Sequence, residues 1–251
     1  MRFDILTIFP DALQSVFSIG VLRQAQEAGL IEVHLHDLRN FTDDPHRVVD
    51  DRPYGGGAGM LMKVEPFVRG IEAIREQTGR ETKAVLLSPQ GRLFHQRDAI
   101  CWGKLDGLIL LCGRYEGVDE RILDYVDDEI SIGDYVLTGG EIPAAVVVEA
   151  TARMTPGVVG QYDSVERDSF FDKKRIGAPQ YTRPPVFRGR DVPEILLSGD
   201  HAKIEAFREA EAWKKTVRNR PDLLGLTVDP PNDRGRPSTR PGNVEGADED
   251  G

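Results

Sequence analysis

Short apolar runs alternate with amphipathic stretches along the first two thirds of the chain. Runs with strand character are Arg2–Phe9, Ile31–Leu35, Lys83–Ser88, Leu108–Cys112 and Glu129–Ile132. Stretches with helical character are Pro10–Gly29, Val64–Gly79, Gln96–Gly103 and Glu141–Met154. The first run is apolar on both faces, which is typical of a central strand. Strands that alternate with helices predict an α/β domain with a largely parallel sheet.

Glycines follow two of these runs, at the point where each predicted strand ends. Gly113 follows one run, and Gly133 follows the next and precedes the pair Gly139-Gly140. Strand ends along one edge of a sheet build the ligand crevices of α/β proteins, and glycine lets a backbone approach a ligand closely. One such turn would indicate only the end of a strand. Two, separated by an acidic segment with Tyr115 and Tyr135, favour a binding site.

The segment Leu38–Lys63 has no clear periodicity and contains a cluster of glycines at Gly55–Gly59. A loop of this length inside a compact domain is usually functional or disordered. The glycines match neither the dinucleotide-binding fingerprint nor the P-loop spacing, which excludes phosphate binding in those two forms.

The last third of the chain has a different character. Val158–Asp172 is expected to be a linker, prolines make Tyr181–Pro185 extended, and Gly199-Asp200 precedes a predicted helix, Ala202–Asn219. This part is expected to form a small helical domain. The tail, Asp229–Gly251, is polar and without aromatic residues, so we expect it to be disordered.

Composition adds a few limits. The chain has 251 residues and a net charge of −10, which argues only mildly against nucleic-acid binding because cations cluster locally in the second half. It has neither a long apolar span nor a signal-peptide pattern. Cys101 and Cys112 match no zinc spacing and make no disulfide scaffold, so a reducing cytoplasm is the expected location.

These features occur within a longer series of motifs. The series comprises FDILTIFP near the start, VDDRPYGGGAGM at 49–60, LLSPQG at 86–91, CGRYEGVDERI at 112–122, IGDYVLTGGE at 132–141, RMTPGVVG at 153–160, DSF at 168–170, YTRP at 181–184 and LLSGDHAKI at 196–204. With these motifs the chain closely resembles the bacterial tRNA (guanine-N1)-methyltransferases of the SPOUT superfamily. The match covers nearly all of residues 1–226, in order.

The resemblance implies a fold and a reaction. The fold is a parallel-sheet SPOUT domain with a C-terminal trefoil knot, which no pattern in the sequence would have predicted because true knots are rare. With it we expect a knotted domain at 1–159, a linker at 160–176 that is flexible without tRNA, a helical tRNA-binding domain at 177–228 and a tail at 229–251. The implied activity is methyl transfer from S-adenosylmethionine to N1 of guanosine 37 of tRNA. A homodimer with an active site shared between subunits is also implied, and Mg²⁺ is a possible cofactor.

Cofactor-binding residues follow from the loops that match the family. S-Adenosylmethionine has no phosphate, so an apolar slot with backbone donors and acceptors would suit its adenine. The expected residues are Leu86, Leu87, Ser88, Pro89, Gln90, Gly91, Gly113, Ile132, Gly133, Asp134, Tyr135, Val136, Leu137, Gly139 and Gly140.

The chemistry requires a base, because guanine N1 carries a proton. If that proton is about as acidic as a tyrosine hydroxyl (~10), an ordinary aspartate (~3.9) needs help to remove it. Burial of the base or a cation at guanine O6 would supply that help. The resemblance assigns these roles to Asp168 as base and Arg153 as cation. From the sequence alone, a helix N-cap for Asp168 and a helix C-terminal contact for Arg153 would be favoured.

Further residues are candidates for contacts with tRNA. The resemblance places Tyr115, Glu116 and Gly59 at the guanine or methionine end of the site, although Tyr115 and Glu116 could equally form a solvated turn. Candidate phosphate contacts are Lys173, Lys174, Arg175, Arg183, Arg188 and Arg190. The segment Phe171–Pro179 departs from the family, which usually has an acidic or small stretch and Gly-Leu-Leu there. The motifs on both sides hold, so only the path of the linker is affected.

Two other functions are compatible with parts of this pattern. A relative that methylates a ribose 2′-hydroxyl would not need Asp168 as a base for guanine. A non-catalytic tRNA- or cofactor-binding module would be expected to lack Arg153 or Asp168, and both are present.

Overall fold

The computed structural model describes residues 1–160, 165–171 and 175–226. The chain separates into two compact units, Met1–Lys173 and Lys174–Gly251, which are described one at a time. The boundary between the units falls inside the expected linker at 160–176. The bounds of the linker and of the flanking domains stay predictions.

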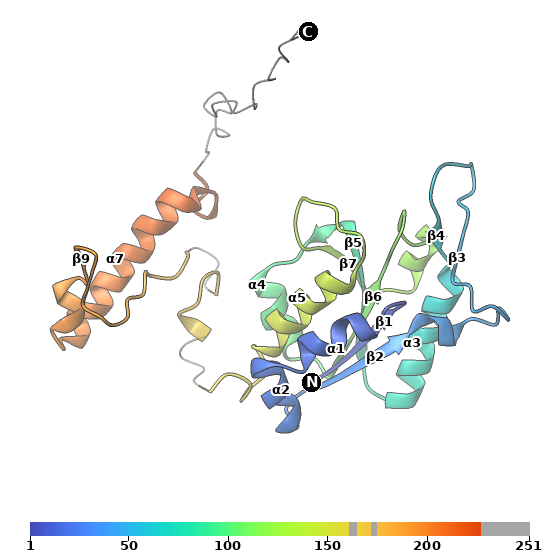
Figure 1. Ribbon diagram of the computed structural model, residues 1–251, viewed down its shortest axis with the longest axis horizontal. Coiled ribbons are helices and arrows are strands. Elements are labelled where there is room, and N and C mark those ends of the chain that lie inside the picture. Colours follow the sequence, from blue (N-terminus) through green and yellow to red (C-terminus); the bar gives the residue numbers. More distant parts are fainter. Residues whose placement is uncertain (161–164, 172–174, 227–251) are drawn as a thin grey trace, which may run out of the picture. The chain divides into compact units, whose positions relative to one another are not determined.

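A parallel sheet of five strands forms the centre of the first unit (Figure 1), in the order β2-β1-β6-β5-β7. The strands are β1 (Arg2–Thr7), β2 (Glu32–Asp37), β5 (Thr82–Leu93), β6 (Gly107–Cys112) and β7 (Asp128–Ser131). All neighbouring pairs run parallel. The α/β fold with a parallel sheet is therefore confirmed, and β1 and β6 are interior strands, as their apolar character indicated.

Helices cover both faces of this sheet, which explains why its strands are apolar on both sides. On one face, Phe3, Ile5 and Leu110 pack with residues of three helices, α1 (Asp11–Phe17), α2 (Gly20–Glu27) and α5 (Glu141–Ala152). On the other face, Leu6 and Ile109 pack with α3 (Val64–Thr78). A further helix, α4 (Gln96–Trp102), packs against α5.

Two elements differ from the sequence prediction. The helix expected at Pro10–Gly29 is two helices, because the chain breaks at Ser18-Ile19 and Gly20 has a φ of 58°. Strand β5 does not end before Pro89. It shifts register between Leu87 and Arg92 and continues to Leu93 beside β7. The edge strand β7 pairs with β5 on both sides of this irregularity, because a bulge interrupts a ladder of hydrogen bonds without ending it.

The segment Leu38–Lys63, predicted without regular structure, contains short elements. They are a 3₁₀ turn, η1 (Leu38–Phe41), and the antiparallel pair β3 (Asp50–Asp51) and β4 (Leu61–Met62). The glycine cluster lies between these two strands. A second 3₁₀ turn, η2 (Glu120–Asp124), follows β6.

The second unit is built around one long helix, α7 (His201–Asn219), whose N-cap Asp200 accepts a hydrogen bond from the Lys203 amide. It also contains β8 (Val186–Phe187), β9 (Arg190–Asp191), η3 (Glu194–Leu197) and η4 (Pro221–Leu224). The helix matches its predicted position. The predicted disordered tail, Asp229–Gly251, lies outside the described residues.

Candidate functional site

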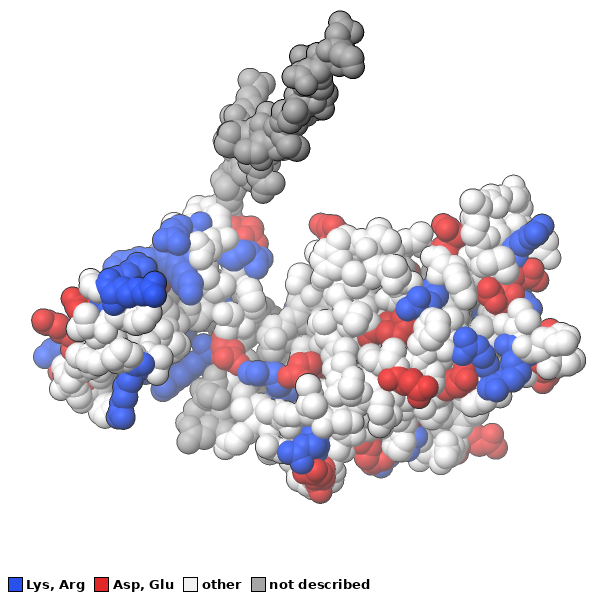
Figure 2. Space-filling model, in the orientation of Figure 1, with Lys and Arg blue, Asp and Glu red and all other residues white. Residues whose placement is uncertain are grey.

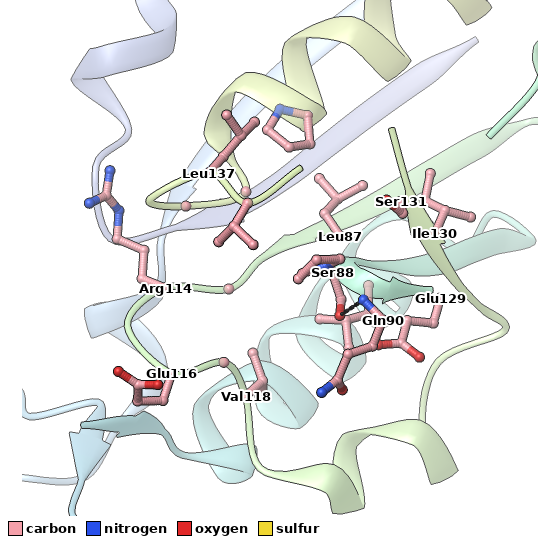
Figure 3. Close-up of a pocket in the computed structure, with 18 of the residues that line it drawn as sticks. Leu87, Ser88, Gln90, Arg114, Glu116, Val118, Glu129, Ile130, Ser131 and Leu137 are labelled. Carbon is pink, nitrogen blue, oxygen red and sulfur yellow. Dashed lines mark hydrogen bonds between the residues drawn. The ribbon is translucent and has the colours of Figure 1, made fainter. Parts of the chain in front are cut away.

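A cavity of about 450 Å³ lies beside the irregular part of β5 and at the carboxyl ends of β6 and β7 (Figure 3). Its size falls in the range of small-molecule sites. The residues expected at the cofactor site that line it are Leu86, Leu87, Ser88, Pro89, Gln90, Gly113, Ile132, Gly133, Tyr135, Val136, Leu137, Gly139 and Gly140. Gly91 and Asp134 were also expected there but are not among the lining residues.

Backbone hydrogen bonds join the loops around this cavity. The Gly140 amide donates to the Gly113 carbonyl at 2.9 Å, and Arg114 forms an antiparallel bridge with Gly139. The Glu116 amide donates to the Met60 carbonyl at 3.0 Å. The loop after β6 is thus tied to the loop after β7 and to the end of the glycine-rich segment.

Two glycines of the cavity region, Gly140 and Gly91, lie in close contact with other backbone, and Gly113 lies close to a side chain. A Cβ added at Gly140 would lie 2.6 Å from the Cα of Cys112, and one at Gly91 would lie 2.4 Å from the Ile130 nitrogen. At Gly113 it would lie 3.0 Å from a Val118 methyl carbon, inside the cavity. Gly140 and Gly91 therefore allow close backbone packing, while a side chain at Gly113 would crowd Val118, which lines the cavity.

The irregular part of β5 is anchored from both sides. The Ser88 hydroxyl accepts from the Gln90 amide, and Arg92 pairs with Asp128 at 2.7 Å. Burial of Asp128 would raise the pKa of its carboxyl, but hydrogen bonds from Arg92 and Lys83 outweigh that and lower it. The Asp128 carboxylate therefore stays charged near neutral pH. Its pair with Arg92 fixes the part of β5 that follows Ser88–Gly91.

The walls of the cavity combine apolar side chains with backbone groups. Apolar side chains, including Leu87, Ile130 and Leu137, line it together with the backbone of glycine-containing loops. Such walls offer apolar contact to a base, and backbone groups fix its orientation by hydrogen bonds.

The residues expected near the reacting end lie together. Tyr115 and Glu116 line the cavity, and a Cβ at Gly59 would lie 2.6 Å from the Oε1 atom of Glu116. Tyr115 has a φ of 60°, an uncommon backbone conformation that often occurs at functional sites. Both side chains are exposed, and the Gly117 amide donates to the Arg114 carbonyl as in a turn, so their place in the site stays a prediction.

Arg153 and Asp168 form an ion pair away from this cavity. The Nη2 atom of Arg153 donates to the Oδ2 atom of Asp168, and the two side chains are 40% and 50% exposed. Arg153 follows the last residue of α5, whereas Gly140 precedes its first. The helix has 12 residues and is about 18 Å long, so it separates the pair from the cavity.

In the described ranges of the chain, no group of three or more His, Cys, Asp or Glu residues could hold a metal ion. Those residues do not fit a built Mg²⁺ site, and no step of the reaction is assigned to a metal. In the same ranges, no helix is long and apolar enough to cross a membrane.

The sequence matches the family described as tRNA (Guanine-1)-methyltransferase TrmD over residues 1–226. The chain belongs to this family. It is similar to proteins named tRNA (guanine-N(1)-)-methyltransferase from Dictyoglomus turgidum and from a Geobacter species. The first is 50% identical over 227 residues, 90% of this chain and 91% of the relative. The second is 51% identical over 225 residues, 89% of this chain and 90% of the relative. The Thermotoga maritima protein of the same name is 50% identical over 224 residues, again 89% and 90%.

The structure describes some of the basic residues that were expected to contact tRNA. Arg175 pairs with Glu209 of α7 at 2.7 Å, and Arg183 is exposed in the same unit. Lys173 and Lys174 lie outside the described residues.

Sequence reasoning missed one group of residues in this family member. The Thr7 hydroxyl donates to the buried Glu141 carboxylate at 2.7 Å, and the Nε atom of Arg114 lies 3.4 Å from the same carboxylate. The only local signal was a glutamate at the start of an Ala- and Val-rich helix that also carries Glu149. Nothing in the sequence indicated its partners, since Thr7 and Glu141 are 134 positions apart.

Proposed function

We propose that the protein transfers a methyl group from S-adenosylmethionine to N1 of guanosine 37 of tRNA. Family membership supports methylation at guanine N1. The observation that carries the proposal is the contact between Arg153 and Asp168, which places a cation and a carboxylate side by side.

The guanine edge matches this pair. Its N1–H donor and its O6 acceptor are neighbouring groups, so an adjacent carboxylate and guanidinium can meet both at once. In the proposed reaction Asp168 accepts the N1 proton while Arg153 stabilises the negative charge that develops on O6. The bound sulfonium supplies the methyl group, so the N1–carbon bond forms as the sulfur–carbon bond breaks. Two features were expected to help the base: its burial, and a cation at guanine O6. Because the Asp168 side chain is 50% exposed in the single chain, the chain by itself supplies only the cation, Arg153.

The proposed cofactor site is the cavity at the strand ends. Its support is the agreement between the residues expected from the family motifs and those that line the cavity. S-Adenosylmethionine would be held by the irregular part of β5 and the loops after β6 and β7, with Tyr115 and Glu116 toward the reacting end.

The position of the ion pair supports a homodimer. The predicted cofactor loops and the predicted catalytic pair lie next to opposite ends of α5, a helix of 12 residues that is about 18 Å long. A site that contains both would form if the Asp168 of one subunit reached the cavity of the other. We therefore propose a homodimer in which the two subunits share each active site.

An exposed apolar face supports the same arrangement. Helices α1 and α5 pack against each other, and Val16, Ile142 and Val146 are exposed on them. Val136, in the loop before α5, is 82% exposed. Figure 2 shows that the surface over these helices is largely free of charged side chains. Apolar patches of this kind are typical of subunit contacts.

A trefoil knot stays part of the proposal. After the edge strand β7, the chain returns to the end of the interior strand β6, where Gly140 bonds Gly113. It then enters α5, which packs against α1 and α4. This return across the strand ends is compatible with the knot that the resemblance implies.

The second unit is proposed to bind tRNA. Helix α7 carries Lys203, Arg208, Lys214, Lys215 and Arg218, and Figure 2 shows basic side chains gathered over this part of the unit. Cations on one surface bind the phosphate backbone without reading sequence. Because tRNA would be the substrate, we place the protein in the cytoplasm.

The direct test is methylation of defined tRNAs by the purified protein. One tRNA carries guanosine at position 37 and a matched tRNA carries adenosine there, and the products are digested to nucleosides for mass spectrometry. The proposal expects N1-methylguanosine from the first tRNA only. A 2′-O-methylated nucleoside, or no methylated product, would contradict it.

A further inference from the structure

Arg114 lies on the wall of the cavity and is held from several sides. Its amide donates to the sulfur of Met62, and its backbone bridges Gly139. Its guanidinium carbon lies 4.5 Å from the centre of the Phe9 ring, a stacking distance for a cation on an aromatic ring. The Arg114 side chain is thus fixed before any ligand arrives.

A buried acid completes this support. The Nε atom of Arg114 lies 3.4 Å from Oε2 and 3.5 Å from Oε1 of Glu141, whose side chain is only 6% exposed. The Thr7 hydroxyl donates to the same carboxylate at 2.7 Å. A buried carboxylate needs such partners, and its place in the first turn of α5 adds the favourable helix dipole.

The outer edge of the guanidinium remains available. Within the part of the chain that the structure describes, Nε is the only guanidinium nitrogen of Arg114 that makes a hydrogen bond. Nη1 and Nη2 therefore keep their donors, and the Arg114 side chain is 27% exposed. A planar, fixed fork with two donating nitrogens matches an oxyanion such as a phosphate or a carboxylate.

We propose that Arg114 binds an oxyanion of a substrate through Nη1 and Nη2, and that Glu141 and Thr7 position it for this contact. The inference rests on the proposed function, which supplies two such oxyanions. One is a backbone phosphate of the tRNA beside the target guanosine, and the other is the carboxylate of S-adenosylmethionine. Because the Arg114 side chain is already ordered, little conformational entropy is lost when it binds the oxyanion.

The test compares Arg114→Gln and Arg114→Lys with Arg80→Gln in the full-length protein. Arg80 is a matched control, because it also pairs with a glutamate, Glu32, but lies just before β5 at the opposite edge of the sheet. Calorimetry measures affinity for S-adenosylmethionine, and filter binding measures affinity for tRNA at several salt concentrations.

The two candidate oxyanions, a tRNA phosphate and the cofactor carboxylate, lead to different expected results. If the oxyanion is a phosphate, Arg114→Gln weakens tRNA binding about tenfold, lowers the salt slope by about one, and leaves cofactor affinity unchanged. If it is the cofactor carboxylate, cofactor affinity falls about tenfold and tRNA binding holds. In either case Arg114→Lys restores only part of the loss, and Arg80→Gln matches the wild type.

A second variant examines the positioning role. Glu141→Gln keeps the shape of the side chain and removes its charge, so it is expected to weaken the same ligand as Arg114→Gln. The double variant should lose little more than Arg114→Gln alone, because both changes act on one contact. Additive losses in the double variant would contradict the role assigned to Glu141.

Unchanged affinity for both ligands in a folded Arg114→Gln protein would overturn the inference. The same conclusion would hold if the substitution weakened the dimer but left both affinities unchanged. If that variant does not fold, side-chain ¹⁵N spectra of the wild type give the answer. The Arg114 Nε signal should shift on addition of S-adenosylhomocysteine or of an anticodon stem-loop, and its constancy with both would also overturn the inference. Failure of the proposed function is distinguishable, because the wild type would then form no N1-methylguanosine.

Discussion

The Arg153 guanidinium, just after the last residue of α5, donates to the carboxylate of Asp168, while Gly140, just before the first residue of the same helix, lines the cavity. One helix therefore separates the proposed catalytic pair from the proposed methyl-donor site. Changes at the two ends of α5 are expected to have separable effects on chemistry and on cofactor binding.

Replacement of Asp168 by Asn should slow chemistry without weakening cofactor binding. The amide keeps the size of the side chain but does not accept the N1 proton usefully, so single-turnover methylation is expected to fall by about 10²–10⁴-fold. Affinity for S-adenosylmethionine, measured by calorimetry, should stay near the wild-type value. A near-wild-type single-turnover rate on bound tRNA would mean that Asp168 is a structural residue.

Arg153 should be sensitive to shape as well as charge. Arg153→Lys keeps a positive charge near guanine O6 but loses the planar fork, whereas Arg153→Ala loses both. Single-turnover rates are expected to follow the order wild type, Lys variant, Ala variant. Equal rates for the two variants would remove the argument that a cation stabilises the developing charge.

Gly113→Val should block the cavity while the fold persists. The added side chain meets a Val118 methyl at 3.0 Å from its Cβ and extends into the site. Calorimetry should show no measurable binding of S-adenosylmethionine, with a thermal unfolding transition like that of the wild type. Gly160→Val is the matched control, because a Cβ there meets no described atom within 4 Å. Unchanged affinity in the folded Gly113 variant would place the cofactor elsewhere.

Removal of the polar tail should not affect methylation. The family match ends at residue 226, before Asp229–Gly251. Protein truncated after residue 228 is expected to methylate tRNA at the full-length rate, measured with equal concentrations of enzyme. A large loss of activity would show that the tail contributes to substrate binding.

Asp4 should make a pH-dependent contribution to stability. Burial would raise the pKa of its carboxyl, but hydrogen bonds from His36 and Arg2 outweigh burial and lower it below the usual value of 3.8. A lowered folded-state pKa stabilises the protein above the unfolded-state value, and this contribution is lost as pH falls through the folded-state value. Near pH 7, Asp4→Asn should lower the free energy of unfolding by about 3 kcal/mol, since it breaks a buried ionic network.

Urea titrations at several pH values would check this prediction, with the exposed Asp106→Asn as control. The difference in unfolding free energy between wild type and the Asp4 variant should shrink below about pH 4. A difference that does not change with pH would exclude the charged network as its source.

Patterns along the sequence predicted the sheet and the cavity because both follow from local rules. An apolar run such as Leu108–Cys112 forms a buried strand, and the glycine that ends it lies at the edge where parallel strands bind ligands. The break at Ser18-Ile19 was missed because both halves of the predicted helix keep helical periodicity. The continuation of β5 past Pro89 was missed because its partner, β7, is distant in sequence.

The ion pair and the support of Arg114 lay beyond any local pattern. Arg153 and Asp168 were joined by the family resemblance, and from the residues alone each favoured a helix cap. Thr7, Arg114 and Glu141 come from three separate elements, and only folding brings them together. Side-chain contacts of this kind depend on the path of the chain between elements, which periodicity does not encode.

The most direct test of the shared active site mixes two inactive variants. Asp168→Asn keeps an intact cavity, and Gly113→Val keeps an intact catalytic pair, so a mixed dimer contains one complete site if the subunits share it. The two proteins, carrying different tags, are co-expressed and assayed for N1-methylguanosine in tRNA. The account predicts about a quarter of wild-type activity from random pairing of equal amounts, while each variant alone has at most about a hundredth of it. Absence of activity in isolated mixed dimers would show that each site is built within one chain, and would contradict the account.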